Sequence, residues 1–276
     1  MMPVFIRIGD FRLTSYVALI GLAGIVTLFY FKHFESRLGL KKPEDFWFLV
    51  NVTGLAGFLG GRLVYLFSSP MVFLGPGDFA SALVSNQTGL STFGALLGVL
   101  AGVTGACWYL GISSLRVFDH VCLAIPLGHA IARVGCFLNG CCYGRAVAGP
   151  LGWSVTFTDP ASAVAPGLLG VPLHPTQLYE AGGDLLLAGL LYFLVRPRVG
   201  RGRFGPGLVS AGYVAGYGVL RYANEAFRAN PELLPGTTIP LAQIYSLVML
   251  PVAAVFMFRA ARWQPAADPP PPIPQQ

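Results

Sequence analysis

The sequence predicts an all-α protein that is embedded in a membrane and crosses it seven times. Hydrophobic residues make up 54% of the chain and charged residues only 11%, whereas a soluble domain carries roughly 25% charged residues. The mean hydropathy is +0.64. Apolar runs of the roughly 20 residues that a membrane crossing needs lie near residues 14–33, 47–67, 92–111, 118–140, 177–195, 206–224 and 239–259.

The segments between these runs predict how the chain is organised. The first run is long enough to span a membrane, and more positive charge follows it than precedes it, so it is not a cleavable signal peptide. The longest polar segments, near 68–91 and 143–176, are rich in Gly, Pro, Ser and Thr, and the second predicts a small head region. We expect one membrane domain over 1–263, followed by a disordered Pro-rich tail at 264–276.

Lysine and arginine predict the orientation. Eleven of them lie in segments on one side of the predicted membrane and four on the other. By the positive-inside rule, the N-terminus and both long polar segments are external, and the C-terminus is cytoplasmic. The net charge of +6 is therefore interpreted as topology, and no nucleic acid partner is expected.

Arginines inside apolar runs indicate a functional site. An arginine at the centre of a membrane helix costs about 2.5 kcal/mol or more and by default marks such a site. Its planar guanidinium suits a phosphate, such as a phospholipid headgroup. Glu225 follows Arg221 by one helical turn, so the two share a helix face; a structural ion pair is the alternative there, and an arginine that extends to the headgroups is the alternative at Arg133. The three arginines are Arg62, Arg133 and Arg221.

Four stretches carry a resemblance to one family. Residues 60–65 (GGRLVY), 133–144 (RVGCFLNGCCYG), 174–180 (HPTQLYE) and 217–228 (YGVLRYANEAFR) resemble, in this order, sequence elements of the phosphatidylglycerol–prolipoprotein diacylglyceryl transferases of bacteria. The resemblance extends over about residues 15–245 and indicates a divergent branch of that family.

The resemblance implies an activity and two substrates. The family transfers a diacylglyceryl group from phosphatidylglycerol to the lipobox cysteine thiol in the signal peptide of a prolipoprotein, at the outer face of the bacterial inner membrane. The leaving group is glycerol-1-phosphate, and no cofactor is implied. The implied catalytic residues are Arg133, Arg221, Glu225, Tyr16, Tyr217 and His174, and the implied substrate-binding residues are Arg62, Arg228, Gly144, Cys136, Cys141, Gln177 and Glu180.

The sequence departs from the family pattern at three places. Phe93 stands where the family has a histidine, Cys136 where it has an asparagine, and Cys141 where it has a glutamate. A phenylalanine cannot move a proton, so the base that activates the thiol has to be found elsewhere. His174 and His129 are the candidates, and activation by nearby arginines alone is the alternative.

The cysteines near the end of the fourth run leave several interpretations open. Cys136, Cys141 and Cys142 could form a disulfide, carry a covalent intermediate, or simply pack as small polarisable side chains. No histidine or acid accompanies them at ligand spacing, so the sequence predicts no metal site. Cys107 and Cys122 lie inside apolar runs and are expected in the core.

Two alternative functions stay open at this point. The departures at Phe93, Cys136 and Cys141 are consistent with a related membrane transferase that has another acceptor or a cysteine-based chemistry. A non-catalytic phospholipid-binding or transport protein that kept the anion site is the second alternative, because interrupted helices near polar residues also occur in transporters.

Overall fold

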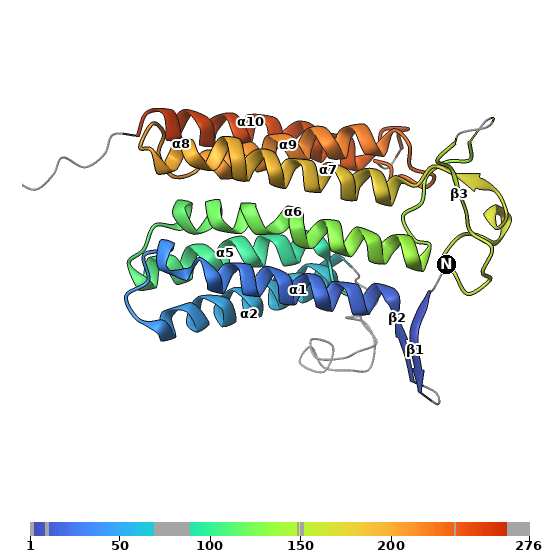
Figure 1. Ribbon diagram of the computed structural model, residues 1–276, viewed down its shortest axis with the longest axis horizontal. Helices are drawn as coiled ribbons and strands as arrows, with labels where there is room; N and C mark the ends of the chain where they lie inside the picture. Colours follow the sequence, from blue (N-terminus) through green and yellow to red (C-terminus); the bar gives the residue numbers. More distant parts are fainter. Residues whose placement is uncertain are drawn as a thin grey trace, which may run out of the picture. The chain divides into compact units, whose positions relative to one another are not determined.

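The computed structural model describes residues 3–8, 11–68, 89–147, 149, 152–234 and 236–263. Long helices dominate these residues, and four short strands accompany them (Figure 1). The predicted tail at 264–276 and most of the polar segment at 68–91 lie outside the described residues.

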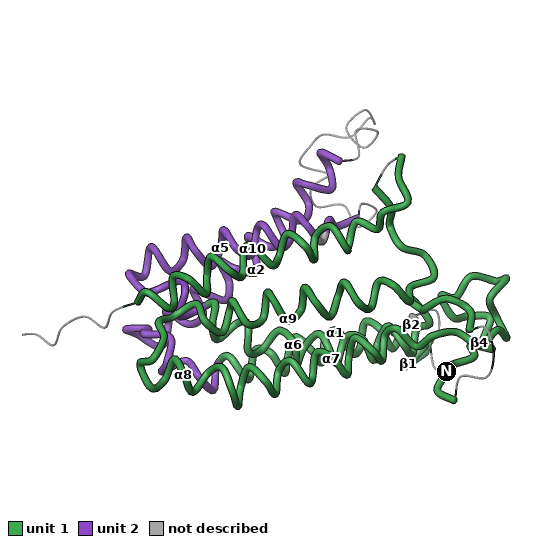
Figure 2. The backbone as a smooth tube through the Cα atoms, turned by 90° about the horizontal axis from the view of Figure 1, so that it is seen from above, with its two compact units in different colours: residues 1–31, 118–276 green, residues 32–117 purple. Residues whose placement is uncertain are grey.

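The chain divides into two compact units (Figure 2). Unit 1 combines residues 1–31 with residues 118–276, and unit 2 contains residues 32–117. All of the predicted site residues except Arg62 belong to unit 1.

Unit 2 is built from two helices that pack through glycines. They are α2 (Pro43–Ser68) and α5 (Thr92–Leu110), preceded by the short η1 (Glu35–Arg37). A Cβ atom added at Gly98 would lie 2.1 Å from the carbonyl oxygen of Ala56, and one added at Gly94 would lie 2.3 Å from that of Gly60. Small residues thus bring the two backbones into direct contact, as is typical of helix pairs in membranes.

The N-terminal part of unit 1 contains a hairpin that the sequence analysis did not predict. Strands β1 (Val4–Ile8) and β2 (Phe11–Thr14) pair in antiparallel fashion ahead of α1 (Ser15–His33). Helix α1 packs against α6 (Ser114–Asn139) at two glycines. A Cβ on Gly128 would meet Thr27, and a Cβ on Gly135 would meet Leu19.

The C-terminal part of unit 1 brings three helical segments together. Helix α9 packs against both α7 and α10. A buried carboxylate on α6, Asp119, accepts hydrogen bonds from the backbone N–H groups of Gly207 and Ser210 and from the Ser210 hydroxyl, which satisfies donors at the N-terminus of α9. The elements are α7 (Thr176–Leu190), a π-helical turn η3 (Leu191–Val195), α8 (Arg196–Gly200), α9 (Leu208–Glu225) and α10 (Leu241–Ala261).

The segment between α6 and α7 folds into a small subdomain around a few apolar side chains. Strand β3 (Val155–Thr156) pairs with β4 (Pro172–Leu173), and η2 (Pro166–Leu168) lies between them. Phe157, Leu173, Val164 and Tyr143 form its buried core.

Six of the described helices are long and apolar enough to cross a membrane. This confirms the all-α membrane class. Helix α9, which covers the sixth predicted crossing, is not among these six helices. It carries Arg221, Asn224 and Glu225 within its last turns, so its composition reflects a polar site more than a lipid-facing surface.

Candidate active site

Glu180 is the centre of a buried polar cluster in unit 1. Its carboxylate accepts a hydrogen bond from Arg133 at 2.9 Å, from the Tyr217 hydroxyl at 3.0 Å and from Asn224 at 3.0 Å. The side chain is only 1% exposed. A buried carboxylate needs such partners, because an unpaired charge away from water is strongly unfavourable.

Three helices supply this cluster. Arg133 comes from α6, Glu180 from the first turns of α7, and Tyr217 and Asn224 from one face of α9. Residues spaced by four and seven positions fall on the same side of a helix, which explains why Arg221 joins Tyr217 and Asn224 on that face. The carboxylate of Glu180 on α7 is therefore hydrogen-bonded to both α6 and α9.

A second ionic group lies at the end of α9. The Nη2 atom of Arg221 is 2.6 Å from Oε2 of Glu225, and Nε of Arg228 is 3.5 Å from the same oxygen. Glu225 is 4% exposed. The predicted pairing of Arg221 with Glu225 is thus confirmed, and one carboxylate orients two guanidinium groups.

Each of the three arginines keeps a buried N–H group that lacks a hydrogen-bond partner among the described residues. These groups are Nε of Arg133, Nη1 of Arg221 and Nε of Arg228. Buried donors are normally satisfied, so a ligand with several acceptor oxygens fits here. The three guanidinium groups offer planar, charged donors that suit the oxygens of an anion such as a phosphate.

A histidine–carboxylate pair adjoins the Glu180 cluster. Nδ1 of His129 lies 2.9 Å from Asp184, and Nε2 lies 3.9 Å from Glu180. Asp184 is fully buried, and the His129 ring packs edge-on against Tyr217. The contact with Asp184 fixes the orientation of the ring. Nε2 is then directed toward Glu180, the carboxylate that binds Arg133.

Gly144 is a point of close backbone approach. It forms an isolated bridge with Arg228, and its N–H donates to the carbonyl oxygen of His174 at 2.9 Å. A Cβ atom there would lie 2.5 Å from the Cβ of His174 and 2.7 Å from the carbonyl oxygen of Phe227. Only glycine fits, because the clashing atoms are largely backbone atoms that cannot move aside.

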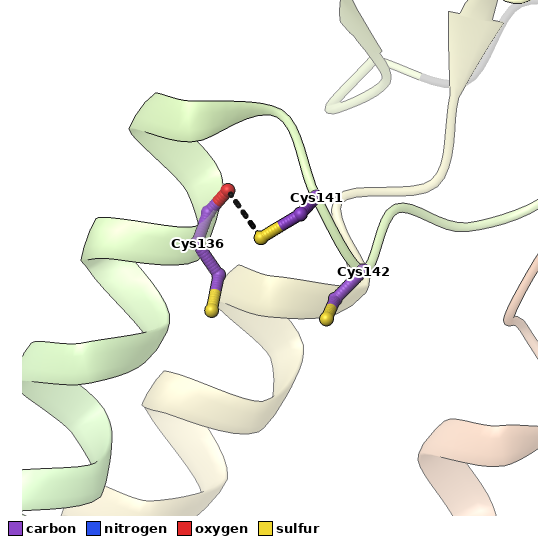
Figure 3. A group of neighbouring side chains, drawn as sticks. All are labelled: Cys136, Cys141 and Cys142. Atoms are coloured by element: carbon purple, nitrogen blue, oxygen red, sulfur yellow. Dashed lines mark hydrogen bonds between the residues drawn. The ribbon is translucent and has the colours of Figure 1, made fainter. Parts of the chain in front are cut away.

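Three thiols meet where α6 ends (Figure 3). The sulfur atoms of Cys136, Cys141 and Cys142 all lie within 4.8 Å of one another, and all three cysteines are free. Gln177 donates to the carbonyl oxygen of Cys141 at 2.7 Å and Thr176 to that of Cys142 at 2.8 Å. The first residues of α7 therefore hold the loop that carries the thiols.

The pKa of the Cys142 thiol is lowered. Hydrogen bonds from the thiols of Cys136 and Cys141 favour its thiolate, and the guanidinium groups of Arg228 and Arg133 add to the effect. A thiolate, not a thiol, is the nucleophilic and metal-binding form of cysteine. The thiol of Cys142 is thus the one of the three that most favours the thiolate form.

Other predicted residues lie outside the Glu180 cluster. Nδ1 of His174 is 3.1 Å from the Tyr179 hydroxyl and its ring stacks near Phe227, so its contacts are to aromatic side chains. Tyr16 is in the first turn of α1, where the backbone packs against Gly135. Arg62 is buried in unit 2 and donates to the carbonyl oxygen of Gly89 at 2.8 Å.

Two residues of the cluster were not predicted as site residues. Asn224 lies on the same face of α9 as Tyr217 and Arg221. Asp184 lies one helical turn after Glu180, and its sequence position suggested only that it could pair with a buried arginine. The signal for Asn224 was its spacing of seven from Tyr217, and that for Asp184 was its spacing of four from Glu180. Phe93, which stands at the position of the family's histidine, lies in unit 2 and is 58% exposed.

Comparisons with known proteins identify the family of this chain. The family model for prolipoprotein diacylglyceryl transferase matches residues 3–259. The chain is 34% identical to a phosphatidylglycerol–prolipoprotein diacylglyceryl transferase of Verminephrobacter eiseniae, over 96% of this chain and 95% of the relative. A transferase of the same name from Azospirillum brasilense is also 34% identical, over 96% of both chains.

A third relative gives the same result. The transferase of Clostridium tetani is 30% identical over 96% of this chain and 99% of its own length. Relatives from three bacteria thus match nearly the whole of this chain. The chain therefore belongs to the prolipoprotein diacylglyceryl transferase family.

Proposed function

We propose that this protein transfers the diacylglyceryl group of phosphatidylglycerol to the lipobox cysteine thiol of prolipoproteins, at the outer face of the bacterial cytoplasmic membrane. The observation that carries the proposal is the set of buried, incompletely bonded guanidinium groups of Arg133, Arg221 and Arg228. The names of the full-length relatives support the same substrates. They do not favour another acceptor or a non-catalytic lipid carrier.

The reaction explains why the site is cationic. The thiol sulfur attacks the glyceryl carbon that is esterified to phosphate, the carbon–oxygen bond breaks, and its electron pair remains on glycerol phosphate. Negative charge therefore develops on the leaving phosphate oxygen. Fixed donors aimed at such an oxygen are typically the largest contribution to catalysis, and Arg133 and Arg221 are in the position to supply them.

The remaining residues of the cluster orient these arginines. Glu180 holds Arg133, and Glu225 holds Arg221 and Arg228. Tyr217 contributes a hydroxyl that is anchored on Glu180, and Tyr16 is the donor expected from α1. Arg133 and Arg221 each keep a buried N–H group that is not the one bonded to its glutamate, so the phosphate binds to these two groups without breaking the pairs.

The proposed topology places this site toward the outer leaflet. Helix α9 is the sixth of seven crossings along the chain and adds to the six helices that are apolar enough to span, with its polar residues turned to the site instead of to lipid. The subdomain between α6 and α7 is then external, and the basic residues after α1, α8 and α10 are cytoplasmic, as the positive-inside rule requires. The Pro-rich tail follows α10 into the cytoplasm.

A transfer assay with the purified protein tests this function. The full chain in phosphatidylglycerol vesicles receives a lipobox peptide, and mass spectrometry measures the peptide. We expect a mass increase of one diacylglyceryl group, which Arg221→Ala abolishes and Arg259→Ala, at an exposed position of α10, leaves intact. An unmodified peptide, with bound phosphatidylglycerol and an intact fold, would refute the proposal.

A further inference from the structure

The proposed reaction needs a thiolate, and the chain lacks the histidine of the family pattern at Phe93. A thiol with an ordinary pKa of about 8.5 is only about 3% thiolate at pH 7. An enzyme that alkylates a thiol therefore gains up to roughly 30-fold in rate by deprotonating it. Cys136 lies one turn after Arg133 on α6, and Cys141 and Cys142, which complete the three-thiol cluster, follow the end of that helix.

We propose that Cys136, Cys141 and Cys142 bind one Zn²⁺ ion, and that the substrate thiol occupies the fourth coordination position of this ion. The inference rests on the proposed function, because it assigns a role to the thiol substrate of that reaction. Catalytic zinc sites keep three protein ligands and one open position. In the part of the chain that the structure describes, the three sulfurs come together without a fourth protein ligand, which matches this arrangement.

The geometry of the cluster fits a zinc ion. Zinc–sulfur bonds of about 2.3 Å in a tetrahedron place the sulfurs about 3.8 Å apart. The three sulfurs already lie within 4.8 Å of one another, so a shift of about 1 Å closes the site. All three ligands come from seven consecutive residues, which limits how far they can move apart.

The loop is held in the conformation that gathers the sulfurs. Cys142 has a φ of 61°, and it is the one non-glycine residue with positive φ in the described part of the chain. Such a backbone conformation persists only when the surroundings enforce it, and it concentrates at functional sites. The N–H of Cys141 donates to the carbonyl oxygen of Cys136, and Thr176 and Gln177 hold the two carbonyl groups of the loop.

The charge around the cluster suits a zinc–thiolate centre. Three thiolates and a substrate thiolate around Zn²⁺ carry a net charge of about −2. Arg133 and Arg228 act electrostatically on the same thiols and offset this charge. The nucleophile would thereby be held beside the arginines that bind the phosphate of the lipid.

The chemical step balances without an oxidant or reductant. The substrate thiol binds zinc as thiolate and releases its proton to water. The zinc-bound sulfur then attacks the glyceryl carbon, and the carbon–oxygen bond breaks toward the phosphate. The thioether product is a weaker ligand than a thiolate, so it leaves the metal.

A covalent lipid intermediate on one of these cysteines is a poor alternative. Attack by Cys142 itself would give a thioether on the enzyme, and a second thiol cannot readily displace a thioether. Such an adduct would end the reaction. Coordination by the same thiols activates the substrate and leaves the enzyme unchanged.

The first test is metal content and spectroscopy. The full chain is purified with Zn²⁺, and the metal is measured per chain; Co²⁺ then replaces it as a spectroscopic probe. We expect about one ion per chain in the wild type and in Cys122→Ser, which alters a core thiol, and none in Cys136→Ser or Cys142→Ser. A lipobox peptide should shift the Co²⁺ thiolate spectrum, and a peptide with serine in place of its cysteine should not.

The second test separates this inference from the proposed function. A chelator should lower the transfer rate roughly 30-fold, and added Zn²⁺ should restore it. An undiminished transfer rate in metal-free protein, or a disulfide between these cysteines in place of bound metal, overturns the zinc site and leaves the proposed function intact. Bound zinc with a peptide-dependent spectrum but no lipid transfer upholds the site and overturns the function.

Discussion

The α2–α5 pair of unit 2 and the α6–α7–α9 cluster of unit 1 are both tightly packed, but by opposite means. In the first, glycines bring backbones together, as at Gly94 and Gly98. In the second, buried charges are joined around Glu180 and Glu225. Glycine contacts let two backbones approach closely, whereas buried ionic groups are costly to desolvate. The costly arrangement is the one that we propose as the active site.

The largest expected effect comes from removing the centre of the ionic cluster. Glu180→Ala leaves Arg133 buried without its partner, and breaking a buried ion pair in this way costs about 3–5 kcal/mol. Thermal unfolding in detergent should show the loss. Glu180→Gln keeps an acceptor oxygen and should lose less; equal losses in both variants would mean that the charge of Glu180 is not what matters.

Substitution of an arginine of the site should lower the rate of the reaction more than the stability of the fold. Arg221→Ala removes one donor to the leaving phosphate, and the loss of such a donor lowers kcat by about 10²–10³-fold. The rate of diacylglyceryl transfer to a lipobox peptide measures it. A variant that transfers lipid at the normal rate would show that Arg221 is only a structural partner of Glu225.

Substitution of a glycine between α2 and α5 should have the opposite effect: it should lower the stability of the fold and leave the reaction rate unchanged. Gly98→Val places methyl groups against the backbone of Ala56, and overpacking of this kind costs about 1–3 kcal/mol. Gly54→Ala is the matched control, since nothing lies within 4 Å of the added atom. We expect a lower unfolding temperature for Gly98→Val, and a normal transfer rate per folded molecule.

The smallest effect concerns the reactivity of one thiol. The pKa of Cys142 lies below its ordinary value of 9.0, so its thiolate persists as the pH falls below 8. In chelator-treated protein, alkylation of Cys142 by iodoacetamide should change little between pH 8 and pH 6. A thiol with an ordinary pKa loses about tenfold per pH unit there. A tenfold loss at Cys142, identified by comparison with Cys142→Ser, would contradict the lowered pKa.

Much of the fold was predictable because a membrane-spanning helix appears in the sequence as a run of about 20 apolar residues. The run predicted at 118–140 is α6, Ser114–Asn139, and that at 206–224 is α9, Leu208–Glu225. The β1–β2 hairpin was not predicted because its strands are far shorter than a membrane-spanning run, and only β2 (FRLT) alternates between apolar and polar residues. The number of crossings depends on α9, whose polar residues serve the site and lower its hydropathy.

The site was predictable where its residues share a helix or a motif. Arg221 and Glu225 are one turn apart on α9, and their pairing follows from that spacing. The contact of Glu180 with Asn224 joins residues 44 positions apart, and no pattern within either helix predicts it. The three cysteines illustrate the same limit, because a helix end and a left-handed residue at Cys142 decide that their sulfurs meet.

Complementation in cells tests the central claim most directly. A bacterium is depleted of its own diacylglyceryl transferase, the full chain is supplied, and one reporter lipoprotein is analysed by mass. We expect the reporter to carry a diacylglyceryl group on its lipobox cysteine, and the Arg221→Ala chain to leave it bare. An unmodified reporter, despite wild-type protein in the membrane, would contradict the claim that this buried arginine site performs prolipoprotein lipidation.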